Sequence, residues 1–420
     1  MRAGARAFRP PAFPMPARLG LGAWRLATML GLPVPRFRED ELIAAARKRT
    51  GLHDLGSEDF RDPMRHLLRA LRDEAGLHLL GTAVMRSSII RAIECRLRME
   101  ALEARYPEIL EIPVEAPVFI TGMQRTGTTK LHRLLSCAPE LRALTAAEGL
   151  NPAPLGRLER ADPEGIAKRL AQARLAERGM KYMSPALFAI HPIEAEAPEE
   201  DVFLFDVTFV SPAIDASLDV PHYAKWMRQI DQRPPYVYFR RLIRLLLWQE
   251  PGRYLGKTPH HQENLDVLFD VFPDAKVIQT HRDPLKVVAS FSSMMVHAGA
   301  MLAKKVDPKK VGRRIADQMV NSVERAIAAR EQTPPGAILD VHYRDLIEAP
   351  LAEMRKIHAF ADLEWNADSE GRVDRWLREN PQHKHGTHRY ELADFGLDAD
   401  ELDARFKRYR ERFDVPREAA

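Results

Sequence analysis

The stretch VFITGMQRTGTT, residues 118–129, decides the expected fold. Its first four residues form a short apolar run, rich in β-formers, of the kind that is buried in a parallel sheet. Gly122 and Gly127 bound the turn that follows, and residues 130–135 have the apolar spacing of a helix. Such a strand, turn and helix start bind anions, because backbone N–H groups and the positive helix end converge on one point. The sequence therefore predicts a phosphate-type loop here.

Three further apolar runs have the character of buried strands, at residues 254–257, 275–280 and 337–341. A helical pattern follows each of them, which indicates βαβ units and a parallel sheet with helices on both faces. The predicted fold class is therefore α/β, a P-loop-type parallel sheet flanked by helices.

The chain divides into three predicted regions. Residues 1–38 form a basic arm without acidic residues, residues 39–112 are helical almost throughout, and residues 113–420 form the P-loop domain with a helical insert at about 161–249. No stretch approaches the roughly 20 apolar residues that a membrane-spanning helix needs. We expect the arm to pack on the body or on a second subunit of a homo-oligomer. The alternative is a peripheral membrane contact through Trp24.

The composition excludes several classes of protein. The 420 residues carry a net charge of only +4, whereas nucleic-acid binding usually needs a concentrated basic face, so no nucleic-acid partner is expected. Cys95 and Cys137 are the only cysteines in the sequence, which excludes a disulfide framework and a zinc cluster. The sequence therefore predicts a globular protein in a reducing compartment, the cytoplasm.

The loop differs from a nucleoside-triphosphate loop at one decisive position. The spacing from Gly122 to Gly127 is the same, but Thr128 stands where a lysine would bridge the β- and γ-phosphates. Arg125 lies inside the loop instead and can place a fixed cation beside a developing negative charge. A P-loop nucleotide kinase is therefore the disfavoured alternative.

A second motif, HRDPLKVVAS at residues 281–290, follows the predicted strand 275–280. Asp283 and Pro284 suit an N-cap and a first helical residue, so a helix should begin here. Arg282 then lies at the carboxyl end of a strand, where open α/β sheets bind ligands, and Ser290 on the helix can add a hydroxyl. By itself this motif is equally well explained as a capped turn.

Together these segments resemble the sulfotransferase family. The loop looks like the family's 5'-phosphosulfate loop, and Arg282 with Ser290, eight residues apart, is similar to its 3'-phosphate site. GKTP at residues 256–259 resembles the Lys-bearing strand end near the transferring group, and VHYRDL at 341–346 looks like the late strand near the nucleotide. The resemblance implies the following donor-binding residues: Gln124, Arg125, Thr126, Gly127, Thr128, Thr129, Arg282, Ser290 and Tyr343.

The resemblance implies transfer of a sulfuryl group from 3'-phosphoadenosine-5'-phosphosulfate (PAPS) to an acceptor hydroxyl or amine, without a metal. Arg125 and Lys257 would stabilise the charge on the sulfuryl oxygens and the leaving phosphate. A non-catalytic nucleotide-binding protein is a further alternative, but it would lack charged groups at positions such as Lys257 and Arg282. The apolar insert suggests a small-molecule acceptor that is hydrophobic: an alcohol, a phenol or a lipid-like molecule.

Two residues compete for the role of general base. Glu148 follows the loop helix, where Golgi-type family members have their base, and we favour it. Cytosolic members place a histidine two residues after the strand-end lysine, whereas here Thr258 and Pro259 separate Lys257 from His260. The acidic stretch at residues 194–201 suits a solvated loop, or alternatively a wall of the acceptor cleft. Three histidines suit a nucleotide lid or a structural role better than a metal site: His383, His385 and His388.

Overall fold

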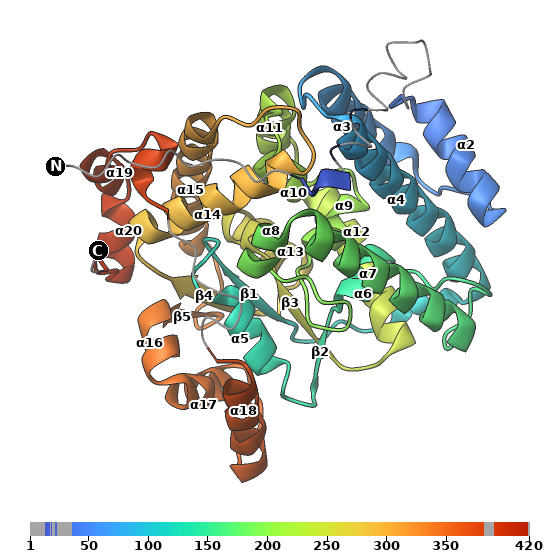
Figure 1. The fold of residues 1–420 in the computed structure, drawn as a ribbon. Coiled ribbons are helices and arrows are strands. Elements are labelled where there is room, and N and C mark those ends of the chain that lie inside the picture. Colours follow the sequence, from blue (N-terminus) through green and yellow to red (C-terminus); the bar gives the residue numbers. More distant parts are fainter. Residues whose placement is uncertain (1–12, 17, 19–21, 23–35, 382–389, 419–420) are drawn as a thin grey trace.

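A computed structural model describes residues 13–16, 18, 22, 36–381 and 390–418 of the protein. Trp24, most of the basic arm and the three histidines of the expected lid lie outside the described residues. Helices surround one central sheet on both sides (Figure 1). Within the described ranges, no helix is long and apolar enough to cross a membrane.

The sheet has five parallel strands in the order β2-β3-β1-β4-β5. Val118 of the central strand lies opposite Leu255 on one side and Lys276 on the other. This arrangement confirms the predicted parallel α/β fold. The strands are β1 (Val118–Gly122), β2 (Leu141–Ala143), β3 (Arg253–Lys257), β4 (Lys276–His281) and β5 (Ile338–His342).

Four of these strands coincide with the predicted runs, and β2 is the one that the sequence analysis missed. It is only three residues long at the edge of the sheet, and an arginine, Arg142, stands at its centre. So short a segment has no periodicity that a pattern can detect.

Alternate side chains of β1 face two different cores. Val118 and Ile120 pack among apolar residues of α5, α16 and α17 on one face, while Phe119 packs against α12 and α13 on the other. All five residues of β1 are buried, as the continuous apolar run predicts. The helices of these two layers are α5 (Thr128–Leu135), α16 (Tyr343–Glu348), α17 (Pro350–Phe360), α12 (Arg233–Gln249) and α13 (Leu265–Val271).

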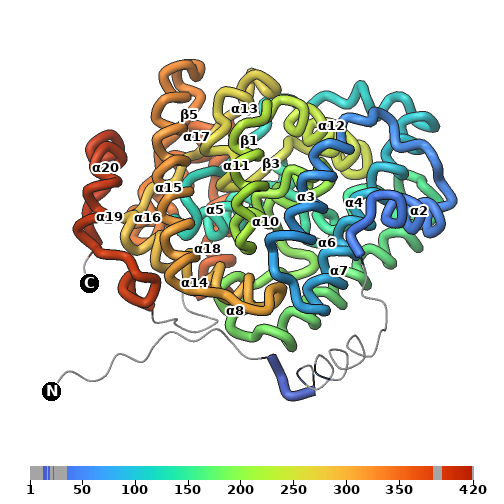
Figure 2. Tube along the Cα trace, turned by 90° about the horizontal axis from the view of Figure 1, so that it is seen from above, coloured from blue at the N-terminus to red at the C-terminus, as the bar shows by residue number. Residues whose placement is uncertain are grey.

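The predicted N-terminal helical region is present and shares a core with the insert. Leu67 and Leu71 belong to the same apolar cluster as Tyr223 and Met227, and α3 and α11 lie side by side in both views (Figures 1 and 2). The N-terminal elements are α2 (Glu39–Thr50), η1 (Glu58–Phe60), α3 (Arg61–Asp73), α4 (Leu79–Arg105) and η2 (Pro107–Glu111). The division into separate regions at residues 38 and 112 stays a prediction.

Helices fill the chain between β2 and β3, where the insert was expected. They begin with α6 and continue across the carboxyl edge of the sheet toward α12 (Figure 1). Besides α12, this segment contains α6 (Ala146–Leu150), α7 (Pro163–Met183), α8 (Pro185–Ile190), α9 (Val202–Asp206), α10 (Pro212–Ser217) and α11 (Pro221–Gln229).

The helix predicted after β4 begins where its capping residues place it. The Asp283 carboxylate accepts a hydrogen bond of 3.0 Å from the Leu285 N–H, and Pro284 is the first helical residue. The remaining elements are η3 (Pro259–Asn264), α14 (Pro284–Ala300), α15 (Pro308–Arg330), α18 (Ala367–Glu379), η4 (Leu392–Phe395), α19 (Ala399–Arg405) and α20 (Lys407–Phe413).

One buried histidine makes the fold sensitive to acid. His132 lies on α5 with no solvent-exposed surface. Burial lowers the pKa of His132 to about 3, and the positive charge of Lys257 acts in the same direction. The folded protein therefore holds this imidazole neutral, whereas in the unfolded chain it takes up a proton near its usual pKa of about 6.5.

We predict that the free energy of unfolding falls as the pH drops below about 6.5, because protons then bind the unfolded chain preferentially. The contribution of His132 reaches about 1.4 kcal/mol per pH unit and ends near the folded pKa of about 3. His132→Leu should remove this contribution, so urea titrations between pH 7 and pH 4 should show a shallower decline for the variant. Parallel declines in the two proteins would contradict the prediction.

Candidate active site

The predicted phosphate loop joins β1 to α5 through three residues in the left-handed region. Their φ angles are 132° at Gly122, 67° at Arg125 and 90° at Gly127. A Cβ on Gly122 would lie 2.5 Å from the carbonyl oxygen of Thr280, and one on Gly127 would lie 2.9 Å from the Tyr343 ring, so neither position admits a side chain. The N–H groups in the first turn of α5 have no partner within the helix and face this loop. The loop therefore has the geometry of an anion cradle.

Thr126 fixes the loop to the neighbouring strand. Its hydroxyl donates to the carbonyl of Met123 at 2.6 Å within the loop and lies 2.6 Å from the hydroxyl of Thr280 on β4. Both threonine side chains are buried. The cradle is consequently held from inside the sheet.

Arg125 connects the loop with the second predicted motif. Its Nε donates to Ser290 Oγ at 3.2 Å, and its Nη1 donates to the carbonyl of Ile190 at 3.2 Å. The main-chain carbonyl of Arg125 in turn accepts a hydrogen bond of 3.0 Å from Nη1 of Arg282. Burial lowers the pKa of Arg125, and among the described residues no carboxylate forms an ion pair with it. A positive charge without an anionic partner therefore lies inside the site.

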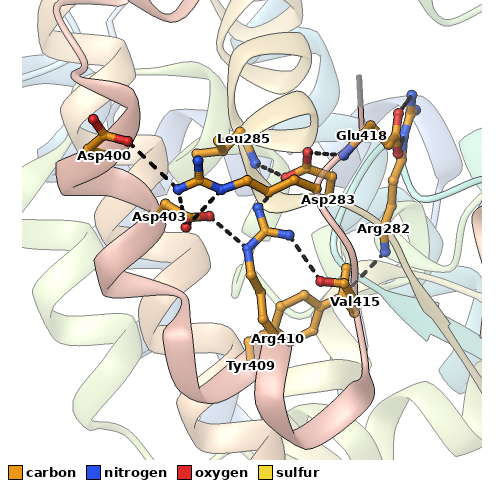
Figure 3. A network of polar contacts seen from close by, with 10 residues as sticks. Arg282, Asp283, Leu285, Asp400, Asp403, Tyr409, Arg410, Val415 and Glu418 are labelled. Carbon is orange, nitrogen blue, oxygen red and sulfur yellow. Dashed lines mark hydrogen bonds and ion pairs between the residues drawn. The ribbon is translucent and has the colours of Figure 1, made fainter. Parts of the chain in front are cut away.

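Arg282 lies at the carboxyl end of β4, stacked on an aromatic ring. Its guanidinium carbon is 3.9 Å from the centre of the Tyr343 ring. The carboxylate of Glu418 accepts from Nε at 2.8 Å and from Nη2 at 3.0 Å (Figure 3). These three residues help to line an open cavity of about 410 Å³. The structure thus brings Arg282, Tyr343 and, through Arg125, Ser290 together beside the loop.

Lys257 reaches the loop from β3. Its side chain is 1% exposed, and its Nζ lies 2.5 Å from Glu200 Oε1 and 3.5 Å from Thr129 Oγ1. The ammonium group is therefore placed at the start of α5, next to the cradle.

The acidic stretch at residues 194–201 is exposed in part, at Glu194 and Glu196, whereas its last three residues are packed against the ends of β2 and β3. These three, residues 199–201, are called the acidic segment below. Asp201 is fully buried and accepts a hydrogen bond of 2.6 Å from the hydroxyl of Tyr254. Burial alone would raise the pKa of Glu199, yet the nearby His191 and Lys257 hold it at about 2. Ligand-type atoms of His191, Glu199 and Glu200 lie within 4.8 Å of one another, and the Lys257 ammonium already pairs with Glu200 among them. The segment thus supplies negative charge directly beside the loop lysine.

His260 lies on η3 and lines a partly open cavity of about 90 Å³ that Gln124 of the loop also lines. Its Nδ1 is 3.3 Å from Glu263 Oε1, and the Asn264 amide donates to its carbonyl at 2.9 Å. Burial would raise the pKa of Glu263, but the contact with His260 holds it below its usual value. This histidine–glutamate pair can accept a proton within the cavity.

Both carboxylate oxygens of Glu148, by contrast, already have hydrogen-bond or ion-pair partners. Its Oε2 accepts from the Thr145 N–H at 3.0 Å and from Nη1 of Arg142 at 3.1 Å, and its Oε1 accepts from Nη2 of Arg142 and lies 3.7 Å from Nη1 of Arg169. Burial would raise the pKa of Glu148, yet Arg142 holds it below the usual value. The carboxylate is not among the groups that line the cavity beside His260.

The comparisons with known proteins agree with this arrangement. The model of the sulfotransferase family matches residues 117–367, which is more than half of the chain. The chain belongs to the sulfotransferase family. The match includes the loop, Lys257, Arg282, Ser290 and Tyr343.

Two solved sulfotransferase structures resemble the whole fold of this family member. Sulfotransferase STF9 from Mycobacterium avium has a TM-score of 0.82 at 28% identity, covering 91% of this chain and 98% of that chain. Sulfotransferase STF1 from Mycobacterium tuberculosis H37Rv has a TM-score of 0.76 at 31% identity, covering 88% of this chain and 98% of the other.

A curated relative is the omega-hydroxy-beta-dihydromenaquinone-9 sulfotransferase Stf3 of Mycobacterium tuberculosis, which is 26% identical over 271 residues. The match covers 59% of this chain and 63% of the length of that relative.

Three predicted site residues have a carboxylate partner that the sequence analysis did not identify. Glu200 pairs with Lys257, Glu263 with His260, and Glu418 with Arg282. Only Glu263 had a local signal, since it lies three residues after His260 in a helical turn. Glu200 lay within the acidic stretch that was considered for the acceptor cleft, and nothing near Glu418 in the sequence indicates Arg282.

We predict that Glu148→Gln destabilises the protein, because Arg142 would lose its buried ion-pair partner and keep only Glu250, whose side chain is 71% exposed. The expected loss is about 3 kcal/mol of unfolding free energy, at the lower end of the range for breaking a buried pair. Differential scanning calorimetry measures it as a lowered melting temperature. Glu140→Gln is the matched control, since Glu140 is an exposed glutamate just before β2 and should change little. Equal melting temperatures for the two variants would refute the structural role of Glu148.

Proposed function

We propose that this chain transfers a sulfuryl group from PAPS to a hydroxyl or amine of a small molecule. The observation that carries the proposal is the direct contact between two anion-binding motifs. Arg125 donates to Ser290 at 3.2 Å and accepts from Arg282 at 3.0 Å, so the loop and the second motif form one continuous positive site. A donor with a 5'-phosphosulfate and a 3'-phosphate needs two such subsites side by side.

In this proposal the loop and α5 hold the 5'-phosphosulfate, and Arg282 with Ser290 and Tyr343 holds the 3'-phosphate side. Arg125 and Lys257 stabilise the charge that develops on the sulfuryl oxygens and the leaving phosphate, since sulfuryl transfer needs mainly positioning and electrostatic stabilisation. The donor would draw the Lys257 ammonium away from Glu200, which lies 2.5 Å from it. No metal is required for these roles.

The donor assignment predicts a strong preference for a 3'-phosphate. Adenosine 3',5'-bisphosphate should bind far more tightly than AMP or ATP, because each lost charge-assisted hydrogen bond weakens binding by about 1.5–3 kcal/mol. Calorimetry in buffer with EDTA measures the three affinities, and Arg282→Ala should remove the preference.

Equal binding of AMP and the bisphosphate would contradict the donor assignment. Magnesium-dependent binding of ATP that exceeds binding of the bisphosphate would favour the nucleotide kinase. Arg378→Ala is a control, since Arg378 is exposed on α18, does not line the cavity beside Arg282 and should keep the preference of the wild type.

For the general base, our proposal departs from the sequence analysis, which favoured Glu148 over His260. His260 lines the cavity that the loop residue Gln124 also lines, and Glu263 lies 3.3 Å from its Nδ1 and can hold the imidazole in place. The Asn264 amide nitrogen lies 3.4 Å from Nε2, so an acceptor hydroxyl would have to replace it there. The Glu148 carboxylate is instead saturated by Arg142 and Thr145. We therefore propose His260 as the base and Glu263 as the residue that positions it.

His260→Ala should lower kcat by about 100-fold or more, as general bases contribute 10²–10⁴, while the affinity for the bisphosphate is retained. Glu263→Gln should lower kcat less and shift the pH profile of the reaction, because it acts through the imidazole. Steady-state assays with labelled PAPS measure both. If Glu148→Gln abolishes turnover in folded protein and His260→Ala does not, Glu148 is the base.

The size and lining of the cavity beside His260 indicate what kind of acceptor could bind there. Its volume of about 90 Å³ suits the reacting end of a molecule and not a whole large substrate. Met123, Phe291 and Met319 form apolar parts of its wall, whereas Gln232, Asn321 and other residues supply polar groups. We propose an acceptor that presents a hydroxyl or amine on an otherwise hydrophobic body. The name of the relative Stf3 describes such an acceptor, a hydroxylated menaquinone.

The location and assembly of the protein belong to the same proposal. Cys95 and Cys137 are free thiols in the structure, which suits the cytoplasm. A homo-oligomer is also proposed.

A further inference from the structure

Glu418 occupies the side of Arg282 that a phosphate would use. Its two carboxylate oxygens lie 2.8 Å from Nε and 3.0 Å from Nη2, which is the paired edge of the guanidinium. Nη1 is bound to the Arg125 carbonyl at 3.0 Å, and the Tyr343 ring covers one face at 3.9 Å. The Nε–Nη2 edge of Arg282 is the one best suited to bind two oxygens of an anion. The Glu418 carboxylate already occupies this edge.

The main chain around Glu418 is fixed by several polar contacts (Figure 3). The Glu418 N–H donates to Asp283 Oδ2 at 2.8 Å, and Nη1 of Arg410 donates to the carbonyl of Val415 at 3.1 Å. Arg417 is paired with Asp403 through Nη2 at 2.5 Å. Residues 415–418 are thus held against the start of α14 independently of the Glu418 side chain.

This anchoring aims the carboxylate at Arg282. Asp283 both caps α14 and receives the Glu418 N–H, so Arg282, the helix start and the segment 415–418 are joined at one point. The carboxylate can nevertheless rotate about its own side-chain bonds into the adjoining cavity without breaking a main-chain contact, since residues 415–418 line that cavity.

We propose that Glu418 is a built-in competitor of the donor's 3'-phosphate, a residue that sets donor affinity by occupying Arg282 until the donor displaces it. The inference rests on the proposed function, because it takes Arg282 as the 3'-phosphate residue. The 3'-phosphate and the carboxylate cannot share the same guanidinium edge, and their like charges repel each other. Binding of the donor therefore requires the Glu418 side chain to rotate away, while its main chain stays in place.

Removing the competing charge should strengthen donor binding. Glu418→Gln keeps the size of the side chain, and Glu418→Ala removes it. Both variants should bind adenosine 3',5'-bisphosphate about tenfold more tightly than the wild type, as expected for release of a charge-assisted pair. AMP lacks the 3'-phosphate, so its affinity should not change. Titration calorimetry on the full chain measures these six affinities, one for each nucleotide with the wild type and with each of the two variants.

Glu411→Gln is the matched control, because Glu411 is an exposed glutamate on the neighbouring helix α20. It should bind both nucleotides as the wild type does. In assays with PAPS, the Glu418 variants should also show a lower KM for the donor, which a purely structural contact would not produce.

One further variant, Arg282→Ala, distinguishes failure of the competition proposal from failure of the 3'-phosphate assignment. If it abolishes the preference for the bisphosphate but Glu418→Gln leaves bisphosphate binding unchanged or weakens it, Glu418 only positions Arg282 and competition is refuted. If Arg282→Ala leaves the preference intact, the assignment of the 3'-phosphate subsite fails, and the inference fails with it.

Discussion

A positive charge is fixed at the point where β1, β4 and α14 meet, and the other groups of the site are arranged around it. Arg125 adopts a left-handed φ of 67°, which turns its carbonyl toward Arg282 while its side chain reaches Ser290. The two glycines of the loop permit this path, and the contact between Thr126 and Thr280 holds it to the sheet. A half-buried guanidinium with neutral hydrogen-bond partners is unfavourable alone, and the anionic donor that we propose would complete its environment.

The acidic segment balances the other cation of the site. Lys257 is buried, and an unpaired ammonium at that position would be strongly destabilising, which Glu200 prevents at 2.5 Å. Asp201 holds the segment in place through Tyr254, so the counter-charge is part of the sheet edge and not of a loose loop. The two cations thus differ: Lys257 has a carboxylate partner in Glu200, whereas Arg125 has no carboxylate partner among the described residues.

Local signals made much of this architecture predictable. The apolar run of β1, the glycine-bounded loop and the Asp283 cap each lie within a few residues, and each was found where the sequence placed it. Contacts between distant segments were not predictable. Glu418 is 136 residues from Arg282, and the pairing of Glu148 with Arg142 depends on an edge strand too short to detect. Sequence patterns thus identified the cations but not the carboxylates that accompany them.

The order of the strands also determines when the sheet can form during synthesis. The central strand is made first, yet Val118 needs Leu255 and Lys276 as neighbours, and the whole helical insert separates them. At translation rates of about 5–20 residues per second, β1 waits on the order of ten seconds for its partners. During that interval its apolar residues are open to chaperones or to misassociation, and the N-terminal helices also lack α11, which completes their core. The central pairs of the sheet therefore cannot be completed until β4 has emerged.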